Sequence, residues 1–143
     1  MRWIIGGAMM AATMLAGCNE RSASNQTAQR AQAVSRADPR LPGGFPIYLG
    51  SAGQVRAFEV METRQGGKIA TFSVQAEPKD VIAFYETAAR NAGLSYAGRF
   101  ETDAQASYEA RRTSGDARPR TFGATAQRKS EWANVTLMFD VTR

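Results

Sequence analysis

The stretch PKDVIAFYETAARNAG, residues 78–93, decides the fold because it carries the strongest helical pattern in the chain. Its apolar side chains recur at helical offsets and form one stripe: Val81, Phe84, Tyr85, Ala88 and Ala92, widened by Ile82 and Ala89. Pro78 suits the first helical position, and Gly93 suits the left-handed residue that ends a helix. An amphipathic helix must bury its stripe, so we expect this one to pack on a sheet.

Period-two patterns on both sides of this helix predict the strands of that sheet. Before the helix, residues 55–61 and 68–75 alternate and flank the turn signal Arg64-Gln65-Gly66-Gly67. After it, four segments are predicted as strands: 94–100, 106–112, 121–129 and 132–141. Gly123 is a candidate bulge position. The order ββαββββ predicts an α+β domain, with an antiparallel sheet of about five to six strands and the helix packed on one face.

Composition divides the chain into three regions. Residues 1–17 combine a basic start with a charge-free apolar run, which predicts a signal peptide too short to be a spanning helix. Residues 18–42 are mainly Ser, Ala, Gln, Asn and Arg, and we expect a flexible tether there because little apolar surface is available for burial. Residues 43–143 are predicted to form a single α+β domain, since the chain is too short for two.

Apolar and aromatic residues in the last region are interpreted as parts of the core. Three prolines and two glycines in residues 38–46 predict an irregular entry path, and Phe45 and Ile47 are apolar enough to pin this path onto the domain. Trp132 and Phe139 are interpreted as core residues in preference to a platform for a ligand.

The apolar run at the N-terminus ends in Leu15-Ala16-Gly17-Cys18, which contains the only cysteine of the chain. This motif resembles the lipobox of bacterial lipoproteins. The resemblance implies cleavage before Cys18, a diacylglyceryl thioether on its sulfur, an acyl chain such as palmitate on the new amine, and a periplasm-facing place in the cell envelope. Enterobacterial lipoproteins with Asp after the cysteine tend to stay at the inner membrane, so Asn19 favours the outer membrane. The alternative is a plain exported protein.

A second resemblance concerns the mature part. The segments Tyr48-Leu49-Gly50-Ser51-Ala52, Phe84-Tyr85 and Gly93-Leu94 resemble small exported bacterial α+β domains with a Tyr-Pro-Gly-Ala-like entry and a helix ending Phe-Tyr-x-x-x-Leu-x-x-x-Gly-Trp. Leucines replace the usual proline and tryptophan, and alanine stands where the helix usually has leucine. The similarity covers residues 44–142 and supports the fold. Because most such domains have no assigned activity, it implies no catalytic residue.

The composition argues against the commonest catalytic chemistry. The chain has no histidine, and its one cysteine is assigned to the lipid, so we predict no cofactor, no metal site and no catalytic residue. The alternative is an envelope hydrolase that cleaves cell wall or glycan with a pair of carboxylates. The acidic residues nearest to predicted strands are Glu59, Glu62, Glu101, Asp103 and Glu109. We favour solvated positions for them, and hence a protein that is not an enzyme.

Basic residues cluster around the loop between two predicted strands. The cluster consists of Arg111, Arg112, Arg118, Arg120, Arg128 and Lys129, and it is opposed by Asp116. On one shared face these side chains could hold phosphates of an anionic lipid or glycan. The alternative is a set of solvated charges that prevents strand edges from pairing. The formal net charge of +5 is too small to name a partner, and nucleic acid is not expected in this compartment.

These observations predict a lipid-anchored binding or assembly module of the cell envelope. It would contact the membrane through the lipid on Cys18. Its further partner would be an envelope protein, or an anionic lipid or glycan that contacts the basic cluster.

Overall fold

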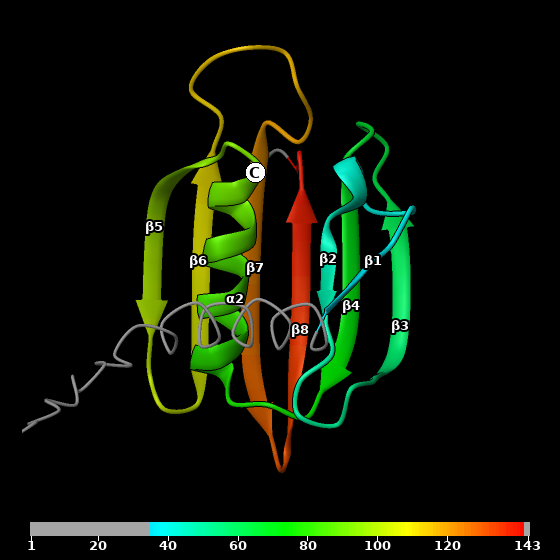
Figure 1. Ribbon diagram of the computed structural model, residues 1–143, viewed down its shortest axis with the longest axis vertical. Helices are drawn as coiled ribbons and strands as arrows, with labels where there is room; N and C mark the ends of the chain where they lie inside the picture. The colour runs from blue at the N-terminus through cyan, green and yellow to red at the C-terminus, as the bar shows by residue number, and fades with distance from the viewer. Residues whose placement is uncertain (1–34, 142–143) are drawn as a thin grey trace, which may run out of the picture.

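A six-stranded antiparallel sheet is the larger layer of the structure, a computed structural model that describes residues 35–141 (Figure 1). Its strands are β3 (Val55–Glu62), β4 (Lys68–Val74), β5 (Ser95–Glu101), β6 (Gln105–Arg111), β7 (Thr121–Lys129) and β8 (Trp132–Phe139). They lie in the order β3-β4-β8-β7-β6-β5, so the last strand of the chain pairs with β4 and β7 near the middle of the sheet. The predicted α+β class, the strand number and the order ββαββββ are confirmed.

Helix α2 (Pro78–Asn91) packs on one face of this sheet, as predicted. Pro78 lies in its first turn, and Gly93 after its end has a φ of 78°. The buried residues of the helix are Pro78, Val81, Ile82, Tyr85 and Ala89. Phe84, predicted in the centre of the stripe, is half-buried and contacts Tyr48, with 4.9 Å between ring centroids. The buried stripe is therefore centred nearer Ile82 and Ala89 than the sequence indicated. Phe84 instead faces a second element, which lies beside the helix.

That second element is a short hairpin of β1 (Ser35–Ala37) and β2 (Pro46–Tyr48), joined through the 3-10 turn η1 (Pro42–Gly44). In Figure 1 it lies beside α2 and in front of the β3, β4 and β8 side of the sheet. Ile47 is fully buried. The centroid of the Phe45 ring lies 4.7 Å from that of Phe122 and 5.1 Å from that of Phe139. The entry path is thus pinned onto the core, as its apolar residues indicated.

The hairpin lies partly within residues 18–42, where we predicted a flexible tether. Residues 35–37 instead form β1, and Leu41 is buried with a 2% exposed surface. The folded region therefore includes residues 35–42, because backbone pairing with β2 and the burial of Leu41 offset the entropy of ordering them. Cys18, the predicted signal peptide and residues 18–34 lie outside the described residues.

The core lies between the sheet and its helix and hairpin cover. Alternate residues of the central strands point into it, including Phe72, Val74, Val135, Leu137 and Phe139, each with at most 3% exposed surface. The Tyr85 hydroxyl accepts a hydrogen bond from the Tyr48 backbone N–H at 3.0 Å and joins α2 to β2. Among residues 35–141 no buried side-chain nitrogen or oxygen lacks a partner.

Bulges occur in the two edge strands and not at Gly123. The register shifts between Arg56 and Glu59 in β3, and between Tyr96 and Gly98 in β5. Gly123 pairs regularly with Glu109 and Met138, so the expected bulge is wrong. A Cβ at this glycine would lie 3.2 Å from the Met138 methyl carbon, which indicates that the small residue makes room for that side chain.

Candidate functional site

One face of the six-stranded sheet has no helix or hairpin over it in the described part of the chain. Helix α2 and the β1–β2 hairpin both lie on the opposite face (Figure 1). Strand register aligns the outward side chains in rows across the sheet. One row reads Glu59, Thr71, Thr136, Thr125, Ser107 and Phe100. The next row reads Met61, Ile69, Met138, Gly123, Glu109 and Gly98.

The centre of this uncovered face has no charged side chain. The outward residues of β4, β8 and β7 at these positions are Ile69, Thr71, Ser73, Asn134, Thr136, Met138, Gly123, Thr125 and Gln127. Ser73 donates a hydrogen bond to the Asn134 side-chain oxygen at 2.8 Å, which links two of the strands. The core of a protein contact is depleted in charged residues, and the centre of this face shares that feature. Its hydroxyl and amide side chains are also what the solvated face of an antiparallel sheet carries.

Three apolar side chains cross one half of the uncovered face. Met61, Ile69 and Met138 are aligned on β3, β4 and β8, and we call them the methionine strip. Met61 is 53% exposed, and the other two are half-buried. Methionine adapts its shape to different partners, and exposed rows of this kind are found at binding surfaces.

The methionine strip ends at a hollow above Gly123. The hollow has a volume of about 360 Å³, and it is lined by Glu109, Ala110, Arg111, Thr121, Phe122, Gly123, Met138 and Val141. Gly123 has no side chain, and the Met138 side chain lies next to it and forms one wall of the hollow. The hollow is large enough to accept one apolar side chain of a partner, with Glu109 and Arg111 at its rim.

Trp132 lies on this face and not in the buried core where we expected it. It is half-buried, and the Arg56 guanidinium carbon lies 3.9 Å from the centroid of its ring, a cation–π contact. The parity of β8 explains the position, because Trp132 alternates with the buried Ala133 and points the same way as Asn134. Phe139, the other predicted core aromatic, is fully buried.

The two sheet edges are poorly suited to pairing with a further strand. Both edge strands are bulged, and inward-pointing charge and bulges are devices that block edge pairing. On β5, Arg99 pairs with Glu86 of the helix and with Glu101, each at 2.6 Å. These ion pairs hold β5 against α2. Neither edge strand therefore offers a regular row of backbone groups to a further strand.

The five acidic residues that a hydrolase would need do not form one site. Glu59 and Glu109 share the uncovered face, but three strands separate β3 from β6, so their backbones are about 19 Å apart at the usual strand spacing. Glycosidase carboxylates lie within about 10 Å of one another. Glu62 is the last residue of edge strand β3, and its side chain is exposed.

Glu101 and Asp103 line a second hollow, of about 210 Å³, near the start of α2 together with Glu77. Two of its three carboxylates already have basic partners: Glu77 pairs with Arg128, and Glu101 with Arg99. The Glu77 and Glu101 side chains are 51% and 43% exposed, whereas a catalytic general acid is usually removed from water. The carboxylates around this hollow are therefore exposed to solvent, and two of them form ion pairs with arginine.

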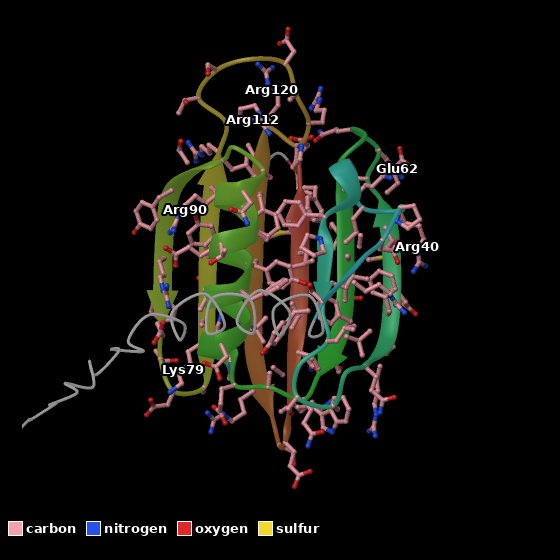
Figure 2. The ribbon with its side chains drawn as sticks, viewed as in Figure 1. Arg40, Glu62, Lys79, Arg90, Arg112 and Arg120 are labelled. Atoms are coloured by element: carbon pink, nitrogen blue, oxygen red, sulfur yellow. The ribbon has the colours of Figure 1, made fainter. Side chains whose placement is uncertain are left out.

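The six basic residues of the predicted cluster lie at two opposite ends of the sheet. Arg111, Arg112, Arg118 and Arg120 surround the loop between β6 and β7, and Figure 2 shows Arg112 and Arg120 at that end. Arg128 and Lys129 follow at the other end of β7, about 26 Å away along the nine-residue strand. A single phosphate site formed by all six is therefore ruled out by the geometry.

Two arginines of the loop are used to hold the fold. One Arg112 terminal nitrogen donates to the Ala92 carbonyl at 2.7 Å, where the unpaired carbonyls of the helix end concentrate negative charge. Arg118 pairs with Asp140 at 3.2 Å, and the Asp140 carboxylate also accepts the Arg120 and Thr121 backbone N–H groups. Arg120 itself lies 3.8 Å from Asp116.

The side chains whose pKa is shifted line neither the hollow above Gly123 nor the hollow near the start of α2. Burial raises the pKa of Tyr85, and burial together with the Glu86 charge raises the pKa of Tyr108. Burial and the charge of Asp80 raise the pKa of Tyr48. In the β1–β2 hairpin, hydrogen bonds from Arg40 hold the pKa of Asp38 below its usual value, despite the opposing effect of burial.

Comparison with protein-family models, curated proteins and solved structures gives no match for this chain. Within residues 35–141 no helix is long and apolar enough to cross a membrane. In the same residues no three His, Cys, Asp or Glu side chains are grouped as a metal site would require.

Proposed function

We propose that the protein is a lipid-anchored binding module of the bacterial cell envelope, without catalytic activity, and that it contacts a protein partner through the uncovered sheet face. The anchor is the lipid that the Leu15-Ala16-Gly17-Cys18 motif would receive on its cysteine. The observation that supports the contact is the methionine strip, which leads to the hollow above Gly123.

The size of this face suits a specific protein contact. Five strand spacings give a width of about 24 Å, and seven residues give a length of about 23 Å, or roughly 550 Å² of flat area. Side-chain relief increases the accessible area toward the roughly 800 Å² that each partner buries in a standard interface. An uncharged centre with methionines, and with Trp132 near its border, matches the usual composition of such an interface.

An envelope hydrolase that uses acidic residues is the alternative, and it has less support. Its mechanism needs two carboxylates that converge on one bond. Glu59 and Glu109 are about 19 Å apart across the uncovered face, and Glu77 and Glu101 are exposed and paired with arginine.

Metabolic labelling with a radioactive fatty acid tests the anchor. We expect the wild-type protein to incorporate the label and to fractionate with membranes. Cys18→Ala removes the thiol that would accept the lipid, so this variant should incorporate none. Label that survives in Cys18→Ala would contradict lipidation at this residue.

Site-specific photocrosslinking in intact cells tests the contact. A photoreactive amino acid at Thr136 would report on the uncovered face, and one at Thr87, which is exposed on α2, serves as a matched control. We expect a discrete protein adduct from position 136 that disappears when Met138→Lys places a charge at the end of the methionine strip. Equal adducts from both positions, or an adduct insensitive to Met138→Lys, would contradict the proposed contact.

A further inference from the structure

The two ends of the sheet carry opposite net charge. At the end that holds the β6–β7 loop, residues 62–68, 111–121 and 140 include six basic and three acidic side chains. We call this the basic end. At the other end, residues 50–56, 75–80, 101–105 and 128–132 include four basic and five acidic side chains. Figure 2 shows Arg112 and Arg120 at the basic end and Lys79 at the opposite one. The molecule therefore has a charge gradient along its strands.

The positive charges of the basic end are available to solvent, whereas one of its acids is turned inward. Arg64 and Arg111 are exposed and form no ion pair within residues 35–141. The Arg118 and Arg120 side chains are 66% and 56% exposed. Asp140 is only 15% exposed, and its carboxylate is occupied by backbone amides and by one arginine.

These charges are spread over a surface and do not converge on a pocket. Arg111 ends β6, and Arg64 lies in the turn between β3 and β4, three strand spacings or about 14 Å from β6. One small anion cannot bridge that distance. A plane of anionic groups can contact all four arginines, and lipid headgroups present such a plane.

We propose that the basic end rests on the anionic lipid headgroups of the membrane that carries the anchor, which depends on the lipidation of Cys18 proposed above. Arg64, Arg111, Arg118 and Arg120 make the contact. Arg112, which is engaged with the helix end, supports the loop from inside.

The length of chain before the folded region permits this arrangement. Residues 18–34 lie between the proposed anchor and Ser35, and seventeen residues span at most about 58 Å. Ser35 pairs with Tyr48, which lies beside Gln75, Glu77 and Asp80, toward the end opposite the basic loop. The chain therefore has to run back along the strands, about 26 Å for a nine-residue strand, which is well within this span. The anchor and the basic end can therefore reach the same bilayer.

This contact would set the direction of the binding face. Strands that meet the bilayer with the basic end stand roughly upright on it, so the uncovered sheet face points sideways, parallel to the membrane. A partner for the methionine strip would then approach as a neighbour on the same membrane surface.

Vesicle binding with matched charge variants tests the inference. The full chain carrying Cys18→Ser removes the anchor, and each variant keeps the same N-terminus, so differences report on the folded region. Arg64→Gln/Arg111→Gln removes two charges from the basic end. Lys79→Gln/Lys129→Gln removes two from the opposite end and is the control, since none of these four residues forms an ion pair within residues 35–141. The vesicles contain phosphatidylcholine alone or with one third phosphatidylglycerol.

We expect binding to the anionic vesicles that weakens with salt and falls about thirtyfold in Arg64→Gln/Arg111→Gln, at roughly fivefold for each lost charge near the surface. The control should lose less than about threefold, since its charges lie away from the membrane. Equal losses in both variants, no loss in either, or equal binding to neutral vesicles would overturn the inference. Fatty-acid labelling of the wild type separates the two proposals: labelled protein without charge-dependent binding retains the anchor and rejects this contact.

Discussion

The two faces of the six-stranded sheet are built on the same strands and have opposite roles. On β8, Leu137 is fully buried beneath the helix and hairpin, while its neighbours Thr136 and Met138 lie on the uncovered face. The covered face is almost entirely apolar, and the uncovered one is hydroxyl-rich with one apolar strip. Buried and exposed side chains alternate along each strand, so a substitution can test the stability of the core or the proposed contact without altering the other.

The largest expected effect is on the covered face. Leu137→Ala should lower the free energy of unfolding by about 2–5 kcal/mol, because it removes buried methyl groups and leaves a cavity. Met138→Ala, one residue along, should cost less than about 1.5 kcal/mol, since that side chain is only half-buried. Urea denaturation followed by circular dichroism measures both. Similar losses of stability in the two variants would contradict the conclusion that only the covered face contributes strongly to stability.

A smaller effect is expected where the helix joins the hairpin. Tyr85→Phe removes the hydroxyl that accepts the Tyr48 backbone N–H, and it leaves this donor without its protein partner. We expect a loss of about 1–3 kcal/mol in the free energy of unfolding, with faster hydrogen exchange at the Tyr48 amide. Unchanged stability and exchange would show that the hairpin is not held to the core by this bond.

A pH-dependent effect is expected at Asp38 in the hairpin. Arg40 lowers the pKa of the folded-state carboxyl, so the ion pair stabilises the fold above the unfolded-state pKa of about 3.9. That contribution is lost as the pH falls through the lowered folded-state pKa. Asp38→Asn should therefore be roughly 0.5–1 kcal/mol less stable than wild type at pH 7, with the gap closing below about pH 4. Denaturant titrations at a series of pH values test this, and a constant gap would contradict it.

The smallest effect on stability is expected on the uncovered face. Gly123→Ala would place a Cβ 3.2 Å from the end of the flexible Met138 side chain, which can shift, so stability should change by less than about 0.5 kcal/mol. The same variant partly fills the hollow and should weaken the adduct from position 136. Gly67→Ala is the matched control, because its Cβ would lie 2.7 Å from the Asp140 carbonyl oxygen and should destabilise the fold. A strongly destabilised Gly123→Ala would show that this face is not permissive.

Much of the fold could be predicted because local patterns and tertiary contacts agree. The periodicity of residues 78–93 and the alternation of β8 gave the layers and most element boundaries within two residues. The β1–β2 hairpin was missed because Ser35–Ala37 is short, polar and pairs with a partner nine or more residues away, which no local pattern indicates. The alternation of β8 places Trp132 on the outward side of the strand. We expected it in the core because tryptophan is generally buried.

The candidate surfaces could be predicted less completely from the sequence than the fold. Arg111, Arg118 and Arg120 were singled out, but Arg64 joins them only because the β3–β4 turn folds to the same end. Arg128 and Lys129 are near in sequence and distant in space, since β7 lies between them and the loop. The methionine strip takes its residues from β3, β4 and β8, so strand register had to be known before the strip could be recognised.

The central position of β8 has a consequence for how the chain acquires its structure. Val74 on β4 pairs with Ala133, nearly sixty residues later, and β8 is the strand that connects β3–β4 to β5–β6–β7. Until residues 132–139 are available, the sheet consists of two separate pieces. Such long-range pairing slows folding, and a chain truncated before residue 132 should remain open and sensitive to proteases. The core can therefore close only when the last strand is present.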